Sequence, residues 1–164
     1  MMKDTFDRTI DYMRISVTDR CNLRCVYCVS SGSLKPLEHK DILQYEEIAR
    51  ILRIAVHKGV RKVRITGGEP LVRKNIHRLI KMIKSIQGID ELSLTTNGIL
   101  LEQYAEELAD AGLDRVNISL DSLKPGRYRE ITRGGDIDAV LRGIKASENA
   151  RLEPIRSTWF QSAD

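Results

Sequence analysis

The chain has 164 residues, which is the usual size of one domain and too short for a complete eight-unit β/α barrel of ~250 residues. Hydrophobic residues make up 41% and charged residues 30% of the sequence, so it can form a core and is not of the disordered class. The formal net charge is +4 and aromatic residues are 5%. So few aromatic side chains disfavour a base-stacking platform, and we expect no nucleic-acid partner.

Strand-like and helix-like patterns alternate along the chain. Period-2 apolar patterns predict strands at 12–18, 62–66, 91–95 and 115–120. Apolar residues at helical spacing predict helices at 45–57, 76–86, 102–111 and 136–149. Loops are expected at 19–41 and around Pro125 and Gly134–Gly135, and 153–156 is the expected entry to a fifth strand. This alternation predicts an α/β unit with parallel strands, either an open doubly wound sheet or part of a barrel.

The N-terminal residues, the apolar content and the cysteines indicate the cellular compartment of the protein. Residues 1–11 contain charged side chains and no apolar run, so they are not a signal peptide. The sequence has no stretch of about 18 apolar residues, and we expect no membrane partner. Its three cysteines lie close together, which does not suit a disulfide framework and indicates a reducing compartment. We therefore expect a cytoplasmic protein.

Polar and glycine-rich segments follow each predicted strand. They are the cysteine loop, Gly67-Gly68-Glu69-Pro70, Thr96-Asn97-Gly98 and Asp121-Ser122. The helix-to-strand connections are plainer. Because parallel α/β sheets build their sites at the carboxyl ends of the strands, this asymmetry predicts one functional face.

Cys21, Cys25 and Cys28 have the spacing Cys-x3-Cys-x2-Cys. Three thiolates can hold three irons of a 4Fe–4S cluster and leave the fourth iron open to an outside ligand. A zinc site is the competing interpretation, although structural zinc takes four protein ligands and the three histidines are not at zinc-finger spacing. Three unrelated buried thiols are the remaining alternative.

This cysteine motif, with Tyr27 before the last cysteine, resembles the signature of radical S-adenosylmethionine (SAM) enzymes. The resemblance implies that Cys21, Cys25 and Cys28 are the metal-binding and catalytic residues, and that SAM caps the open iron. It also implies that an electron donor reduces the cluster, which then cleaves SAM to methionine and a 5′-deoxyadenosyl radical. The implied fold is an incomplete TIM-like barrel with about four βα units and the start of a fifth strand.

The glycine motif agrees with this resemblance. Glycines let a backbone approach a ligand closely, although an ordinary strand–helix turn is the alternative. The resemblance implies that the segment from Gly67 to Glu69 binds the SAM ammonium group, with Glu69 supplying a negative charge. It also implies that Gly68 and Ser119 lie against SAM and that Tyr27 offers backbone contacts to it.

Four ordered runs, at 14–25, 64–71, 95–98 and 117–122, are similar to the molybdenum cofactor biosynthesis protein A family. This resemblance implies GTP 3′,8-cyclase activity, in which hydrogen is removed from the ribose and the sugar carbon attacks C8 of guanine. Arg14, Arg64 and Thr95 would contact GTP, and Arg156, where the family often has lysine, keeps a basic side chain for phosphate. Arginine suits phosphate oxygens, but a strand arginine paired with a surface acid is the alternative. Asn97 and Asp121 would also lie near these ligands, and turn formation is an equally good explanation of both residues.

The likeness predicts a partial radical SAM core at 1–156 and a tail at 157–164 that is unlike the family and is not a recognisable strand. The family has a C-terminal extension whose cysteines hold a second cluster, and no cysteine follows Cys28 here. Two other hypotheses are therefore a SAM-binding remnant that does not cyclise GTP and a different radical SAM enzyme, such as a peptide modifier. An incomplete barrel has open strand edges and uncovered apolar surface, which predicts self-association.

Overall fold

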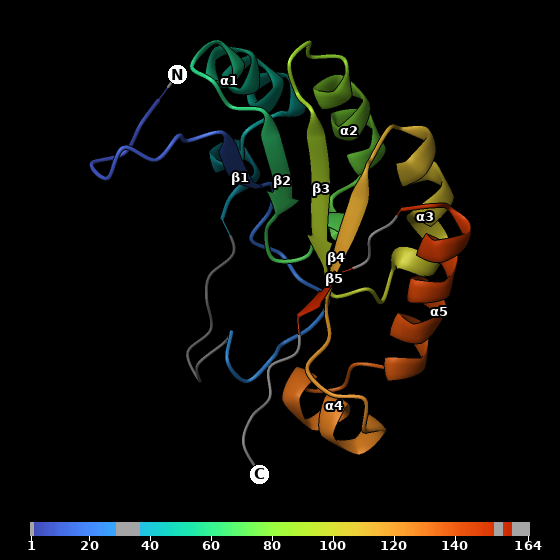
Figure 1. Cartoon of the computed structure of the whole chain (residues 1–164). Helices are drawn as coiled ribbons and strands as arrows, with labels where there is room; N and C mark the ends of the chain where they lie inside the picture. Colours follow the sequence, from blue (N-terminus) through green and yellow to red (C-terminus); the bar gives the residue numbers. More distant parts are fainter. Residues whose placement is uncertain (1, 29–36, 153–155, 159–164) are drawn as a thin grey trace.

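The computed structural model describes residues 2–28, 37–152 and 156–158 (Figure 1). Its centre is a parallel sheet in the order β1-β2-β3-β4-β5. The strands are β1 (Tyr12–Ser16), β2 (Lys62–Thr66), β3 (Glu91–Thr96), β4 (Arg115–Ser119) and β5 (Arg156–Thr158). A doubly wound sheet reverses its strand order at a switch point. The order here follows the sequence, so the alternative left open by the patterns is decided in favour of a partial barrel.

Helices cover one side of this sheet (Figure 1), namely α1 (Tyr45–His57), α2 (Ile76–Lys84), α3 (Leu101–Asp110) and α5 (Ile137–Asn149). A further helix, α4 (Pro125–Thr132), lies beyond the carboxyl ends of the strands, and η1 (His39–Asp41) and η2 (Pro70–Val72) are short 3-10 turns. The predicted helices are confirmed to within two residues at each end. No helix among the described residues has the length and apolar character needed to cross a bilayer.

The core lies between the sheet and the helices. Alternate strand residues point towards the helices and are fully buried, namely Val63, Ile65, Leu92, Leu94, Val116 and Ile118. Leu79, Ile80 and Ile83 of α2 meet them from the helix side. Burying each such side chain contributes about 1.5–3 kcal/mol, so this layer holds the strand ends in place.

The opposite face of the sheet is polar and partly open. Arg14 and Ser16 of β1 are exposed, and Arg64 and Thr95 are half-buried. Strand alternation puts most apolar side chains under the helices and polar ones on the open face. Tyr12 of β1 is nevertheless 37% exposed on this face, so the expectation of uncovered apolar surface on the incomplete barrel stays a prediction.

The segment after β4 was expected to be a loop, and this expectation is wrong. Residues 125–132 form α4, with Pro125 in its first turn, where a missing N–H costs nothing. Arg133 takes a left-handed conformation at its end, and the Gly134 amide donates to the Arg129 carbonyl at 2.8 Å. The helix was missed because only Tyr128 and Thr132 are buried, too few to produce a visible helical period.

The fifth strand begins at Arg156, the last residue of the expected strand entry, and runs on to Thr158. It pairs with β4 in parallel, with Arg156 opposite Asn117. It therefore extends two residues into the segment that was expected not to form a strand. Residues 153–155 and 159–164 lie outside the described part of the chain.

Candidate functional site

The loops that follow the first four strands meet at one edge of the sheet, as the asymmetry of the sequence predicts. The cysteine loop follows β1 and is attached to the end of α4. The Val26 amide donates to the Ile131 carbonyl at 2.9 Å, and the Arg24 amide donates to the Thr132 carbonyl at 3.3 Å. Cys25 lies between these two bonds and is 8% exposed. The helix that the sequence did not reveal is therefore a platform for the cysteine motif.

The three thiols are free and differ in exposure: Cys25 is buried, Cys21 is half-buried and Cys28 is exposed. The Cys28 amide donates to the Cys25 carbonyl at 3.0 Å, which closes a turn between them. Burial raises the pKa of Cys25 and of Cys28, and the negative charges of Asp121 and of neighbouring thiolates add to the rise. A hydrogen bond with Tyr27 opposes the rise at Cys25.

The glycine motif packs directly on the cysteine loop. The Gly68 amide donates to the Thr18 carbonyl at 2.7 Å, and the Glu69 amide donates to the Arg20 carbonyl at 2.8 Å. A Cβ on Gly67 would lie 2.6 Å from the Thr18 oxygen, and one on Gly68 would overlap the Arg20 carbonyl. The close approach of the chain's own backbone therefore already requires glycine at both positions, and the contact of this segment with SAM stays a prediction.

Glu69 is 1% exposed and its carboxylate joins two loops. Oε1 accepts from the Leu71 amide at 3.0 Å and from the Thr96 hydroxyl at 2.8 Å, and Oε2 accepts from the Asn97 amide at 2.7 Å. Burial raises the pKa of the Glu69 carboxyl, and these hydrogen bonds oppose that rise. The side chain predicted to face the SAM ammonium group is thus used to connect the ends of β2 and β3.

Asn97 and Asp121 connect their loops to the cysteine motif. Asn97 forms a turn by accepting from the Ile99 amide at 3.1 Å, and its Nδ2 donates to Asn22 Oδ1 at 2.8 Å. Asp121 accepts from the Tyr27 hydroxyl at 2.8 Å. Asn97 therefore forms the turn that the sequence allows, and its contact with a ligand stays a prediction. The Tyr27 side chain has a partner that the sequence did not predict.

The residues predicted to contact GTP share the open face of the sheet. Arg14 lies opposite Arg64 on the neighbouring strand, and Arg64 lies opposite Ser93. The Arg64 guanidinium lies 5.4 Å from the centre of the Tyr12 ring. No described carboxylate pairs with Arg14 or Arg64, so the ion-pair alternative has no support among these residues.

Two further positions complete this face. Thr95 lies opposite Asn117, a buried residue that the sequence did not single out, although it has the same period-2 phase as Ser119. Nδ2 of Asn117 has no described hydrogen-bond partner. Ser119 is half-buried at the carboxyl end of β4. This face is therefore rich in hydrogen-bond donors, which suits an anionic or oxygen-rich substrate.

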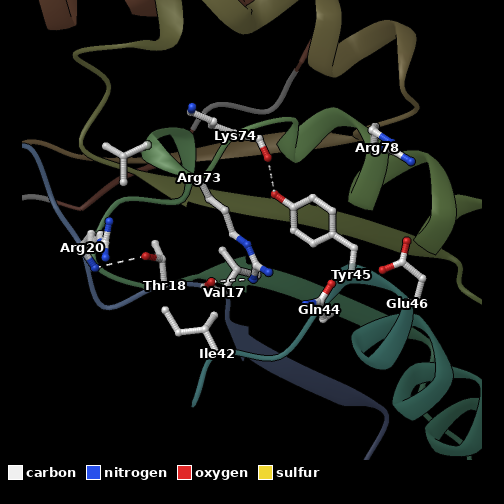
Figure 2. A pocket seen from close by; sticks show the side chains of 11 residues that line it. Val17, Thr18, Arg20, Ile42, Gln44, Tyr45, Glu46, Arg73, Lys74 and Arg78 are labelled. Carbon is white, nitrogen blue, oxygen red and sulfur yellow. Dashed lines mark hydrogen bonds between the residues drawn. The ribbon is translucent and has the colours of Figure 1, made fainter. Parts of the chain in front are cut away.

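A basic cavity of about 620 Å³ lies beside the cysteine loop, at the starts of α1 and α2 (Figure 2). Arg73 reaches from the η2 segment across it and donates to the Val17 carbonyl at 2.7 Å. Its guanidinium lies 4.3 Å from the centre of the Tyr45 ring. The exposed side chains of Arg20, Lys74 and Arg78 also line the cavity. Its charge favours anions at this end of the sheet.

The family model for the radical SAM superfamily matches residues 15–160. The chain belongs to the radical SAM superfamily. The cofactors of this superfamily are a 4Fe–4S cluster and SAM.

Curated relatives show which members of the superfamily this chain is similar to. A GTP 3′,8-cyclase of Alkaliphilus metalliredigens is 56% identical over 94% of this chain and 48% of its own length. A GTP 3′,8-cyclase of Heliobacterium modesticaldum is 53% identical over 94% of this chain and 47% of its own length. The chain thus spans about half the length of these relatives.

Solved radical SAM folds are also similar. Streptococcus suis SuiB bound to its precursor peptide SuiA has a TM-score of 0.77 at 22% identity, over 94% of this chain and 34% of that chain. HydG, a maturase of the [FeFe]-hydrogenase, has a TM-score of 0.73 at 19% identity, over 91% of this chain and 34% of that chain. These likenesses show the fold, which confirms the predicted incomplete radical SAM barrel.

The cysteine loop fits the cluster of this superfamily in its donor chemistry. All three cysteines lie on one loop and none is in a disulfide, and thiolate is the ligand that iron–sulfur clusters take. Within the described ranges, no three His, Cys, Asp or Glu side chains converge as they would around a single metal ion. Thiolates that bind different irons of one cluster surround a larger centre than a single ion, so we expect Cys21, Cys25 and Cys28 to take one iron each.

Proposed function

We propose that this chain carries the SAM-cleaving core of a GTP 3′,8-cyclase. The observation that carries the proposal is the identity of 53–56% to proteins of that name over 94% of this chain. The position of Arg14, Arg64 and Thr95 on one donor-rich face, beside the cysteine loop, supports it. Because the chain spans about half of those relatives, the cyclisation itself belongs to the proposal.

The proposed role of each residue rests on its place in the fold. Cys21, Cys25 and Cys28 hold the cluster, and Ser119, at the end of β4, lies on the side where SAM would bind. The cluster, when bound and reduced by an external low-potential electron donor, supplies the electron that cleaves SAM. Arg14 and Arg64 bind the GTP phosphates by charge-assisted hydrogen bonds. Arg156, which pairs with Asn117 on the neighbouring strand, is proposed as a further phosphate ligand. The three free thiols support a reducing compartment, which we propose is the cytoplasm.

The test is anaerobic reconstitution with iron and sulfide, followed by SAM, dithionite and GTP. We expect a brown protein with broad iron–sulfur absorbance that forms 5′-deoxyadenosine, and more of it when GTP is present. Cyclised GTP would establish the full reaction. Formation of 5′-deoxyadenosine without any response to GTP would favour the SAM-binding remnant, and an iron-loaded protein that leaves SAM intact would contradict the proposal.

We also propose that the chain associates through its strand edges. Among the described strands, β1 and β5 each pair on one side only, so backbone N–H and C=O groups are left for another strand. We expect the mass measured by light scattering to rise with protein concentration. Because strand pairing joins uncharged backbone groups, this association should persist in high salt, and a compact monomer at millimolar concentration would contradict it.

A further inference from the structure

The sulfur of Cys21 is approached by two nitrogen donors. One is local: the Leu23 backbone nitrogen lies 3.3 Å from Cys21 Sγ. The other is Nδ2 of Asn97, 3.8 Å from the same sulfur and 76 positions away in the sequence. A side chain from the loop after β3 thus contacts a predicted cluster ligand in the loop after β1.

The carboxamide of Asn97 can point in one direction only. Its Oδ1 accepts from the Ile99 amide at 3.1 Å, which fixes the oxygen end of the group. Nδ2 must then face the cysteine loop, where one of its two hydrogens is donated to Asn22 Oδ1 at 2.8 Å. The second hydrogen is left for the Cys21 sulfur. The Asn97 backbone is itself held by the Glu69 carboxylate.

We propose that Asn97 is a positioning residue that donates a hydrogen bond to the Cys21 thiolate and so makes the cluster easier to reduce. The inference rests on the proposed cluster ligands, and it assigns to Asn97 a role beyond the turn that it forms. The step concerned is a one-electron reduction by an external reductant, in which no covalent bond forms or breaks.

The direction of the effect follows from electrostatics. Reduction adds one negative charge to the cluster and its thiolates, and an N–H donor stabilises the more negative state more strongly. Hydrogen bonds to the sulfurs are among the features that set the potentials of iron–sulfur clusters. Loss of the Asn97 donor should therefore lower the reduction potential.

The test compares the reconstituted wild type with N97S and N22A, in a potentiometric titration followed by electron paramagnetic resonance. Serine keeps an oxygen that can accept from the Ile99 amide but lacks the amide donor. N22A removes the other partner of Nδ2, together with an oxygen 3.9 Å from the Cys21 sulfur, and leaves the Asn97 donor in place. At a fixed potential, we expect the ratio of reduced to oxidised cluster in N97S to fall about threefold to tenfold. The same ratio in N22A should not fall, because the oxygen that N22A removes does not stabilise the added negative charge.

Iron content and the thermal unfolding of the metal-free proteins serve as controls, and we expect both to match the wild type. An N97S protein with normal iron content and an unchanged potential would overturn the inference, as would an equal shift in N22A. A folded N97S protein that loses its iron would also overturn it, by assigning Asn97 to cluster assembly. Failure of the wild type itself to bind iron would instead contradict the proposed function.

Discussion

Replacing Cys25 by serine should abolish cluster binding and, with it, the cleavage of SAM. A serine oxygen is a hard donor, whereas the irons of these clusters take soft thiolates. Loss of an outer-shell partner of a metal site already costs about 10–100-fold, so loss of a ligand should lower 5′-deoxyadenosine formation by more than about 100-fold. The measurements are iron per protein after reconstitution and product formed in single turnover.

Cys25 is the most informative of the three ligands because the structure fixes it independently of any metal. The bonds from its two neighbours to the end of α4 use backbone atoms, so C25S should keep the loop in place and lose the metal alone. Val26→Ala is the matched control, since Val26 is the next residue and its side chain is 47% exposed. Equal iron content in C25S and the wild type would remove Cys25 from the ligand set.

Replacing Glu69 by glutamine should destabilise the fold and loosen both loops that the carboxylate joins. Its two oxygens accept three hydrogen bonds, and a carboxamide offers one oxygen. At least one buried donor would then face an N–H group, at a cost of about 1–3 kcal/mol. For a chain of this size, that cost lowers the melting temperature by roughly 3–10 °C, which calorimetry of the metal-free protein would measure.

The control for this change is Glu106→Gln, an exposed position on α3, which should leave the melting temperature within about 1 °C.

Local patterns predicted most of the fold. Alternation such as Val63 and Ile65 beneath Arg64 identifies a strand and its buried face, and the apolar stripe of α2 does the same for a helix. The order of the strands is a property of the whole chain, so the patterns left barrel and doubly wound sheets as equal alternatives. α4 escaped detection because it buries little apolar surface, although Pro125 and Gly134 are suitable start and stop signals.

The site was predictable where a motif carries the chemistry and unpredictable where two loops meet. The spacing of Cys21, Cys25 and Cys28 predicts a cluster loop without any structure, and the family match agrees with the cluster although the ligands themselves stay a prediction. The motif around Glu69 was correctly placed at the end of β2, but its partners Thr96 and Asn97 lie 27 and 28 positions away. No local pattern encodes such a pairing. The same holds for Tyr27 and Asp121, which are 94 positions apart.

The strand order has a consequence for how the protein is made. Each strand of the sheet pairs with the strand that precedes it in the sequence. As the chain leaves the ribosome, every new strand therefore meets a partner that has already been synthesised, and each helix packs as its unit is completed. Two paired strands are separated in the sequence by only one helix and its connections. Bringing them together therefore closes a short loop, and the conformational entropy lost is small. The sheet can thus grow by one unit at a time from its amino-terminal edge.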